Sequence, residues 1–248
     1  MRKFVLLAGA LAASLSVNAQ ESDMALNVKE AMKSENRTEA EVDRDRNRRP
    51  VRTLDYFGIT PEMKVLELIP GGGWYTKLLA PSLRDKGELH VALFTDRVKE
   101  NLITMEGLDK INILEPDFEI DAGEDNLRTI NAFTLSEKNF DAVLTFRNMH
   151  NFDAEGRKNI NDAVFKALKK GGTYGVVDHT RRHMEPITSE NRRRADPVTI
   201  IKELLDAGFV FEGYSGLHRK PDDELRYEVG RKSVTGNSDR FTLLFKKP

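Results

Sequence analysis

The 248-residue chain contains no cysteine, and this absence excludes several kinds of chemistry. A protein without thiols has no disulfide framework, no thiolate metal site and no cysteine nucleophile. Charge of one sign is not in excess either, because 39 basic and 40 acidic side chains give a net charge of −1. Such a balance provides no overall attraction to nucleic acid or to an anionic membrane. We therefore predict no nucleic-acid partner.

Long apolar runs are also scarce, and the most prominent lies at the N-terminus, from Phe4 to Val17. Two basic residues precede this run, and VNA at positions 17–19 forms a small-residue cleavage site before Gln20. These are the three regions of a secretory signal peptide, and the run is too short to span a bilayer comfortably. The sequence predicts a signal peptide at residues 1–19 and export to the periplasm or the medium; the alternative is a buried N-terminal helix. With no cysteine for a lipid anchor, we expect no stable membrane anchor after cleavage.

After the predicted cleavage site, residues 20–48 form a polar extension that ends in an arginine-rich run, RDRNRR at positions 44–49. A basic cluster suggests nucleic acid only when aromatic or groove-reading residues accompany it, and none do here. We therefore expect a helical extension with a solvated or ion-paired face. Residues 49–248 contain no internal repeat or low-complexity linker, and they are long enough for one α/β domain with a sizeable core.

The chain is organised around the sequence VLELIPGGGWYTKLLAP at positions 65–81. Its first five residues are typical of a buried parallel strand, and Pro70 ends that strand because proline has no N–H for the ladder. Three consecutive glycines then permit positive φ angles and leave space for a ligand: Gly71, Gly72 and Gly73. The amides at the start of the following helix face a ligand in nucleotide-binding turns of this kind. Glu67 lies inside the predicted buried strand, so its carboxylate needs a partner, either in the protein or in a ligand.

Apolar runs and helical patterns alternate along the rest of the chain. Further strands are predicted at 89–94, 111–114, 140–146, 173–177, 209–214 and 240–245, and helices at 50–57, 98–106, 161–169 and 198–207. This alternation predicts an open α/β sheet, in which ligands bind at the carboxyl ends of the strands. Arg147, Asn148 and His150 follow the strand at 140–146, and Asp178 and His179 follow the strand at 173–177. These side chains are therefore candidates for the functional site.

The order of elements and several motifs resemble a class I S-adenosylmethionine-dependent methyltransferase. VLELIPGGGWY is similar to the first motif of that fold, FDAVLTFRNMHNF to its fourth strand, and ALKKGGTYGVVDH to its glycine turn and fifth strand, with Lys170 replacing the usual proline. DAGFVFEG and SDRFTLLFKKP resemble its closing helix and final strand hairpin, and PGGGWYTKLLAP, TFRNMHN and DRFTLLFKKP together resemble a group of exported, predicted methyltransferases. The resemblance covers about Arg44 to Pro248. It implies a Rossmann-like, doubly wound sheet of seven strands with a final antiparallel strand.

The resemblance also implies S-adenosylmethionine as the cofactor and assigns residues to it. The three glycines would pass close to its methionine and ribose, and Glu67 would order their loop or meet the cofactor ammonium group. Tyr75, beside Trp74 at the start of the helix, would lie under the cofactor or pack in the core. Asp96 would bind the ribose hydroxyls, although it stands later than the usual position about twenty residues past the glycines. Asp117 would meet the adenine amino group or belong to an acidic turn.

Arg147 and Asn148 complete the predicted cofactor-binding set. Arg147 could hold the cofactor carboxylate or an anionic substrate, or it could form a structural ion pair. Methyl transfer from a sulfonium is an in-line displacement, so a base is needed only where the acceptor carries a proton. His150 and His179 are the predicted catalytic residues because histidine titrates near neutrality; each could instead cap a strand end or bond a carboxylate.

Three classes of function remain open at this stage. The leading hypothesis is methyl transfer to a small molecule outside the cytoplasm, and the alternative is an exported ligand-binding protein that keeps the fold without catalysis. Export keeps the alternative open, because the methyl donor is made inside the cell. A nicotinamide-dependent oxidoreductase is disfavoured by the PGGG loop and the final strand pair. Asp178, His179 and His183 could ligate a metal, but no further ligand spacing supports such a site, and we predict none.

Overall fold

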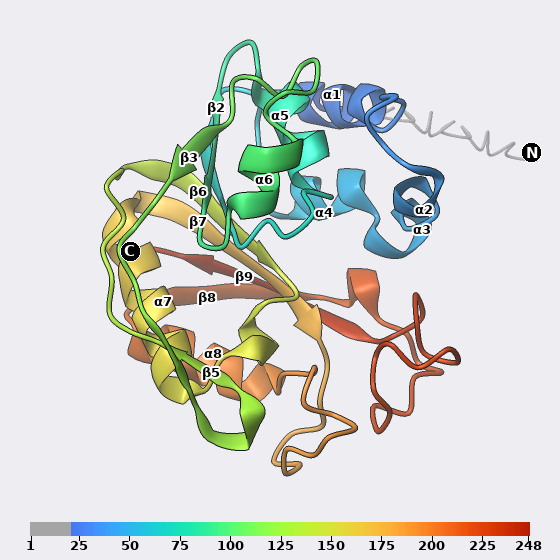
Figure 1. The fold of residues 1–248 in the computed structure, drawn as a ribbon, viewed down its shortest axis with the longest axis vertical. Helices are drawn as coiled ribbons and strands as arrows, with labels where there is room; N and C mark the ends of the chain where they lie inside the picture. Colours follow the sequence, from blue (N-terminus) through green and yellow to red (C-terminus); the bar gives the residue numbers. More distant parts are fainter. Residues whose placement is uncertain (1–20) are drawn as a thin grey trace, which may run out of the picture.

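A seven-stranded sheet forms the centre of the molecule (Figure 1), in the strand order β3-β2-β1-β6-β7-β9-β8. The computed structural model describes residues 21–248, so the predicted signal peptide lies outside the described part of the chain. The strands are β1 (Lys64–Leu68), β2 (Glu88–Ala92), β3 (Asn112–Leu114), β6 (Phe140–Phe146), β7 (Leu168–His179), β8 (Val210–Ser215) and β9 (Arg240–Lys246). All neighbours pair in parallel except β9, which lies antiparallel between β7 and β8. The predicted doubly wound α/β sheet with a final antiparallel strand is confirmed.

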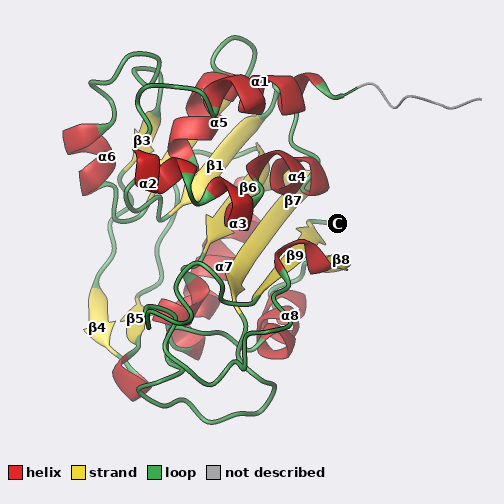
Figure 2. Ribbon diagram, turned by 90° about the vertical axis from the view of Figure 1, so that its right-hand side faces the viewer, coloured by secondary structure: helices red, strands yellow, loops and turns green. Residues whose placement is uncertain are grey.

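Helices cover both faces of this sheet, as Figure 2 shows from a second direction. Side chains of α1 (Asp23–Ala31), α4 (Pro50–Tyr56), α5 (Thr76–Leu83) and α6 (Asp96–Asn101) belong to one hydrophobic core. Side chains of α7 (Ala154–Ala167) and α8 (Pro197–Asp206) belong to a second core on the other face. The strands between them are buried on both sides, which explains why VLEL and FDAVLTF read as nearly continuous apolar runs. Short 3₁₀ turns at Glu124–Asn126, Met149–Asn151 and Gly216–His218 complete the described elements.

Four helices begin at side chains that accept a backbone N–H from the first turn. Ser22 caps α1, Asp153 caps α7, and Asp196 caps α8 directly before Pro197. Thr38 starts α2 (Glu39–Val42) with a reciprocal capping box to Glu41. Such caps satisfy amides that have no partner inside the helix, and this fixes where each helix starts.

The observed elements differ most from the predicted ones in two regions, while the strand predicted at 89–94 ends at Ala92 and the helix predicted at 98–106 spans Asp96–Asn101. The helix predicted at 161–169 starts earlier, because Asp153 caps it, and β7 continues back through Gly171 and Gly172 to Leu168. A two-stranded antiparallel ribbon of β4 (Ile120–Ala122) and β5 (Arg128–Ile130) was not predicted. Its strands are only three residues long and mostly exposed, so they lack the apolar alternation that identifies a strand.

The N-terminal extension packs against the sheet domain through α1, where Met24 and Val28 are buried. Leu26, on the same helix, is exposed. After α2, helix α3 (Asp45–Arg48) leads into α4. Trp74 Nε1 donates to the Glu41 carbonyl, which ties α2 to the glycine loop. The division of the chain at residue 48 stays a prediction. Within residues 21–248, no helix combines the length and the apolar character needed to cross a membrane.

Candidate active site

The carboxyl ends of β1, β2 and β6 carry an unusual backbone conformation. Four non-glycine residues have left-handed φ angles there: Ile69 (54°), Leu93 (67°), Phe94 (53°) and Arg147 (65°). Non-glycine residues seldom adopt this conformation, and where they do it costs energy and concentrates at ligand sites. Three strand ends with the same feature mark one edge of the sheet as the candidate site.

The glycine loop lies at the end of β1 and places each of its three glycines differently. Gly71 has a φ of 60° and lines a cavity, while Gly72 has open space where a Cβ would be. Gly73 has a φ of 77°, and a Cβ there would overlap Leu102 Cδ2. The structure therefore requires glycine at position 73 for packing, whereas Gly72 leaves room that the protein itself does not use.

Glu67 lies in β1, and its side chain is 3% exposed. Its Oε2 accepts a hydrogen bond from Thr76 Oγ1 at 2.6 Å, which joins the strand to the start of α5. Burial raises the pKa of Glu67 to about 8, although the Thr76 bond and the Arg48 charge act in the opposite direction. The carboxyl has found a protein partner, and it is protonated at neutral pH.

This protonation predicts a pH dependence of folding stability. Glu67 ionises near pH 4.5 in the unfolded chain and near 8 in the folded one, so its stabilisation is full below pH 4.5 and is lost as the pH rises to about 8. Glu67→Gln keeps an acceptor for Thr76 and cannot ionise. Between pH 5 and pH 8 we expect the free energy of unfolding of the wild type to fall by on the order of 3 kcal/mol more than that of the variant. Urea unfolding at both pH values measures the difference, and equal losses would contradict the assignment.

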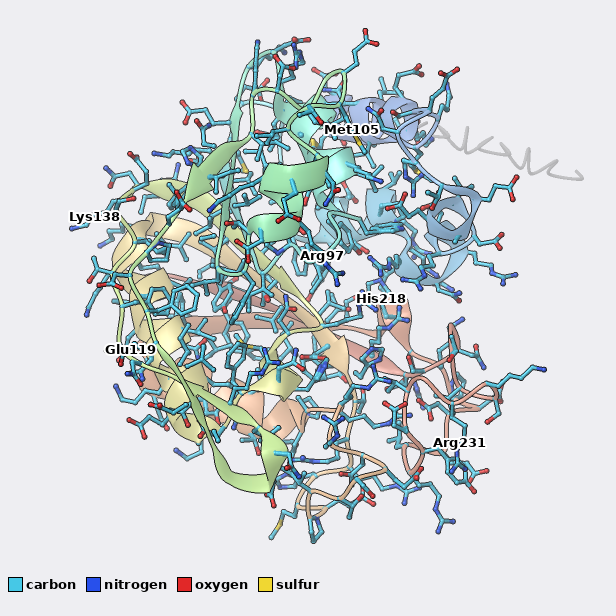
Figure 3. The ribbon with its side chains drawn as sticks, viewed as in Figure 1. Arg97, Met105, Glu119, Lys138, His218 and Arg231 are labelled. Carbon is cyan, nitrogen blue, oxygen red and sulfur yellow. The ribbon has the colours of Figure 1, made fainter. Side chains whose placement is uncertain are left out.

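A cavity of about 410 Å³ lies at the ends of β1 and β2, and we call it the strand-end cavity. Gly71, Phe94 and Asp96 line it, together with Arg97, which is labelled in Figure 3. Asp96 stands four residues beyond Ala92, the last residue of β2, and two left-handed residues lie between them. Asp96 nevertheless lines the same cavity as Gly71. The late position of this acid in the sequence therefore does not remove it from the site.

Three other predicted cofactor residues have protein partners or lie outside the strand-end cavity. The Tyr75 ring stacks on the Phe146 ring with 3.5 Å between the ring centroids, and the Tyr75 hydroxyl donates to the Arg48 carbonyl at 3.2 Å. The Asn148 amide donates to the carbonyls of Leu68 and Ile69, which ties β6 to the end of β1. Asp117 is exposed and lines neither this cavity nor the one described next. Their binding roles stay predictions, and packing or positioning accounts for Tyr75 and Asn148.

His150 and Asp178 form a buried pair at the ends of β6 and β7. His150 Nδ1 lies 2.6 Å from Asp178 Oδ1, and the backbone amides of His150 and His179 also donate to this carboxylate. Because a carboxylate only accepts, Nδ1 carries a proton, and in the neutral imidazole this leaves the lone pair on Nε2. Asp178 is fully buried, so the imidazole is held in one orientation. This is the arrangement of a positioned general base.

His179 lies beside His150, with 5.8 Å between the ring centroids. Its Nδ1 is 2.9 Å from Ser238 Oγ. Burial lowers the pKa of His179 well below its usual value, and the charges of Arg240 and Arg147 lower it further. The structure thus brings both predicted catalytic histidines together and keeps His179 neutral.

A second cavity of about 600 Å³ adjoins the histidines, and we call it the arginine cavity. Residues of α2–α3, β9 and the segment before β9 line it, and Figure 1 shows these parts at the same end of the sheet. Its lining includes six arginines: Arg44, Arg46, Arg48, Arg147, Arg193 and Arg240. His150 and Asn151 line both cavities, so the two meet at the candidate base.

Much of this arginine cavity was not predicted from the sequence. The run at positions 44–49 was expected to be solvated or ion-paired, and this is wrong for Arg48, which is 6% exposed and has no ion-pair partner among residues 21–248. Arg240 stands at the start of a strand whose sequence reads as ordinary β structure. One signal was available: RDRNRR carries more positive charge than its own acids neutralise.

Neither the alternative metal site nor a cluster of similar ligands is present among the described residues. His183 Nδ1 bonds Asp196 Oδ2 at 2.8 Å, so it belongs to the start of α8 and not to the Asp178 pair.

No protein-family model matches the chain, and no curated protein matches it in sequence. Solved structures do resemble it. A SAM-dependent methyltransferase from Aquifex aeolicus has a TM-score of 0.57 and 14% identity over 90% of this chain and 98% of that one. The [4+2]-cyclase SpnF has a TM-score of 0.56 and 13% identity, over 91% of this chain and 93% of that one. Human N-acetylserotonin methyltransferase in complex with SAM has a TM-score of 0.54 and 14% identity, over 90% of this chain and 56% of that one.

These likenesses define the fold as that of class I S-adenosylmethionine-dependent methyltransferases. At such identities they carry no residue roles, and SpnF shows that the fold also occurs in a protein described as a cyclase.

Proposed function

We propose that the protein transfers a methyl group from S-adenosylmethionine to a small-molecule acceptor. The observation that carries this proposal is the meeting of two cavities at His150, one beside the glycine loop and one beyond the histidines. A methyl transferase needs such an arrangement, because donor and acceptor must approach each other in line.

The residues of the strand-end cavity fit the cofactor. Asp96 offers an exposed carboxylate for ribose hydroxyls, and Phe94, which packs at 5.4 Å against Phe118, offers an aromatic surface for adenine. Gly72 leaves open space beside the start of α5. S-adenosylmethionine supplies an electrophilic methyl group on a sulfonium. His150 Nε2 takes the proton from an attacking hydroxyl or amine, and Asp178 holds the imidazole in place.

Calorimetry separates this function from the two alternatives. We expect heat of binding with S-adenosylmethionine and with its demethylated product, and none with NAD. Binding without turnover on any acceptor would favour the exported binding protein. No heat with either sulfur compound at millimolar concentrations would contradict the proposal.

Gly72→Val tests whether the glycine loop receives the cofactor. Among the described residues, no atom lies within 4 Å of the position that a Cβ at residue 72 would take, and its φ is not in the left-handed region, so we expect the fold to keep its stability. Residue 72 follows Gly71, which lines the strand-end cavity, so a branched side chain there would crowd the loop that we propose receives the cofactor, and we expect at least about a tenfold weaker affinity for S-adenosylmethionine. Calorimetry and thermal unfolding of the same variant give both quantities. An unchanged affinity would sink the assignment of the loop.

We also propose that the mature chain acts outside the cytoplasm. The support is the N-terminal pattern of basic residues, apolar run and VNA site. N-terminal sequencing of the protein from a periplasmic fraction should begin at Gln20; an intact Met1 there would contradict cleavage.

A further inference from the structure

Three arginines on the wall of the arginine cavity lie close to one another, two of them buried and the third partly buried. Arg48 and Arg240 are 6% and 7% exposed, and Arg147 stands on the left-handed turn after β6. Burial lowers the pKa of Arg48 to about 9 and that of Arg240 to about 10, and each also feels the positive charge of Arg147. A group of buried like charges is unfavourable unless an opposite charge joins it.

The described residues form no ion pair that would supply that opposite charge. Within residues 21–248, the guanidinium groups of Arg48, Arg147 and Arg240 form no ion pair, and neither do those of the exposed Arg44 and Arg46. Arg240 Nη1 donates to the Asn47 carbonyl at 3.2 Å, but its Nε is buried without a hydrogen-bond partner. Among the described residues, the Arg48 guanidinium contacts aromatic rings, and its Cζ lies 4.3 Å from the centroid of the Trp74 ring. These donors are therefore free for a ligand.

The nearby acids are few and already engaged. Asp43 is the one acidic residue that lines the cavity. Asp178 is close enough to influence Arg147 and Arg240, but its two oxygens accept N–H bonds from His150 and His179. Glu228 pairs with Arg193, which removes that arginine from the free set.

The proposed cofactor increases the need for negative charge. S-adenosylmethionine carries a sulfonium, an ammonium and one carboxylate, so its net charge is about +1 near neutral pH. One carboxylate can satisfy one of the guanidinium groups, and the remaining positive charge of site and cofactor has to be met by the second substrate.

We propose that the acceptor is an anion with a phosphate or carboxylate group, which the unpaired arginines of the cavity bind beside His150. This inference rests on the proposed function and adds the class of its acceptor. Guanidinium groups suit such ligands because their paired N–H donors match the oxygens of phosphate and carboxylate.

Calorimetry with pyrophosphate and with citrate, at low and at high salt, tests the inference. We expect both to bind, more weakly at high salt, and the tighter of the two shows whether phosphate or carboxylate is preferred. Arg44→Gln/Arg46→Gln removes two exposed charges and should weaken binding about tenfold, and Arg147→Gln by at least as much. Arg52→Gln, an exposed arginine of α4 that does not line the cavity, should change it less than about twofold.

Several outcomes overturn the inference. They are no binding of either anion by the folded wild type, equal weakening by Arg52→Gln, and loss of anion binding when S-adenosylmethionine saturates the protein. The last would assign the arginines to the cofactor carboxylate. Thermal unfolding of each variant separates lost binding from lost folding, and the double variant lies on exposed positions of the α2–α3 segment. The anions are titrated first without cofactor and then with saturating S-adenosylmethionine. The first titration does not depend on the cofactor, so failure of the methyl-transfer proposal appears separately, as missing heat with S-adenosylmethionine.

Discussion

His150→Asn is expected to lower the rate of methyl transfer by about 10²–10⁴-fold, the usual contribution of a general base. The asparagine amide can take the place of Nδ1 in the 2.6 Å bond to Asp178, so the buried carboxylate keeps its partner. The variant lacks an atom equivalent to Nε2, which we assign to the acceptor's proton. Transfer of a labelled methyl group to hydroxyl-bearing phosphates and carboxylates, with wild type and variant compared on the same acceptor, measures the loss.

His183→Asn is the matched control for this prediction. His183 also bonds a carboxylate through Nδ1, but it pairs with Asp196 at the start of α8 and lines neither cavity. We expect its rate to stay within about twofold of the wild type. A rate of methyl transfer in His150→Asn less than about fivefold below that of the wild type would contradict the role of a base. The attacking atom of the acceptor would then carry no proton.

The fold could be predicted from sequence because its central strands are buried on both faces. FDAVLTF gave β6 with both bounds correct, and β1 and α8 were each displaced by one residue. Errors arose where local patterns are weak. The β4–β5 ribbon has exposed residues on both strands, and α7 begins at an Asp153 cap that lies before its apolar stripe.

Only the site residues at the carboxyl ends of the strands could be predicted from the sequence. His150 and His179 follow consecutive strands of the sheet order, so their proximity follows from topology. The arginine cavity draws Arg48 from the N-terminal extension and Arg240 from the last strand, nearly two hundred positions apart. No spacing in the sequence relates these two residues. The left-handed conformation of the two residues before Thr95 and Asp96 is likewise a product of tertiary packing, because Leu93 and Phe94 have no preference for it.

Arg194→Met is expected to lower the free energy of unfolding by about 3–5 kcal/mol, because it leaves a buried carboxylate without its counter-charge. The side chains of Arg194 and Asp223 are 0% and 2% exposed, and they form two parallel bonds of 2.8 and 3.0 Å. The guanidinium also donates to the carbonyls of Thr180 and Tyr227. These bonds hold the polar segment before β9, which carries Ser238 to His179. Urea unfolding at pH 7 measures the loss.

Arg231→Met provides the comparison, because Arg231 pairs with Glu190 across 3.2 Å while both side chains are about half exposed. It lies on the outer side of the same segment (Figure 3), and we expect a loss of about 1 kcal/mol or less. Arg194→Lys keeps the charge but not the paired N–H donors, so its loss should fall between the two. Anion binding should weaken in Arg194→Met even where the protein is still folded, because the segment that it anchors forms one wall of the arginine cavity. If Arg194→Met lost no more stability than Arg231→Met, the buried pair would not be what holds this wall in place.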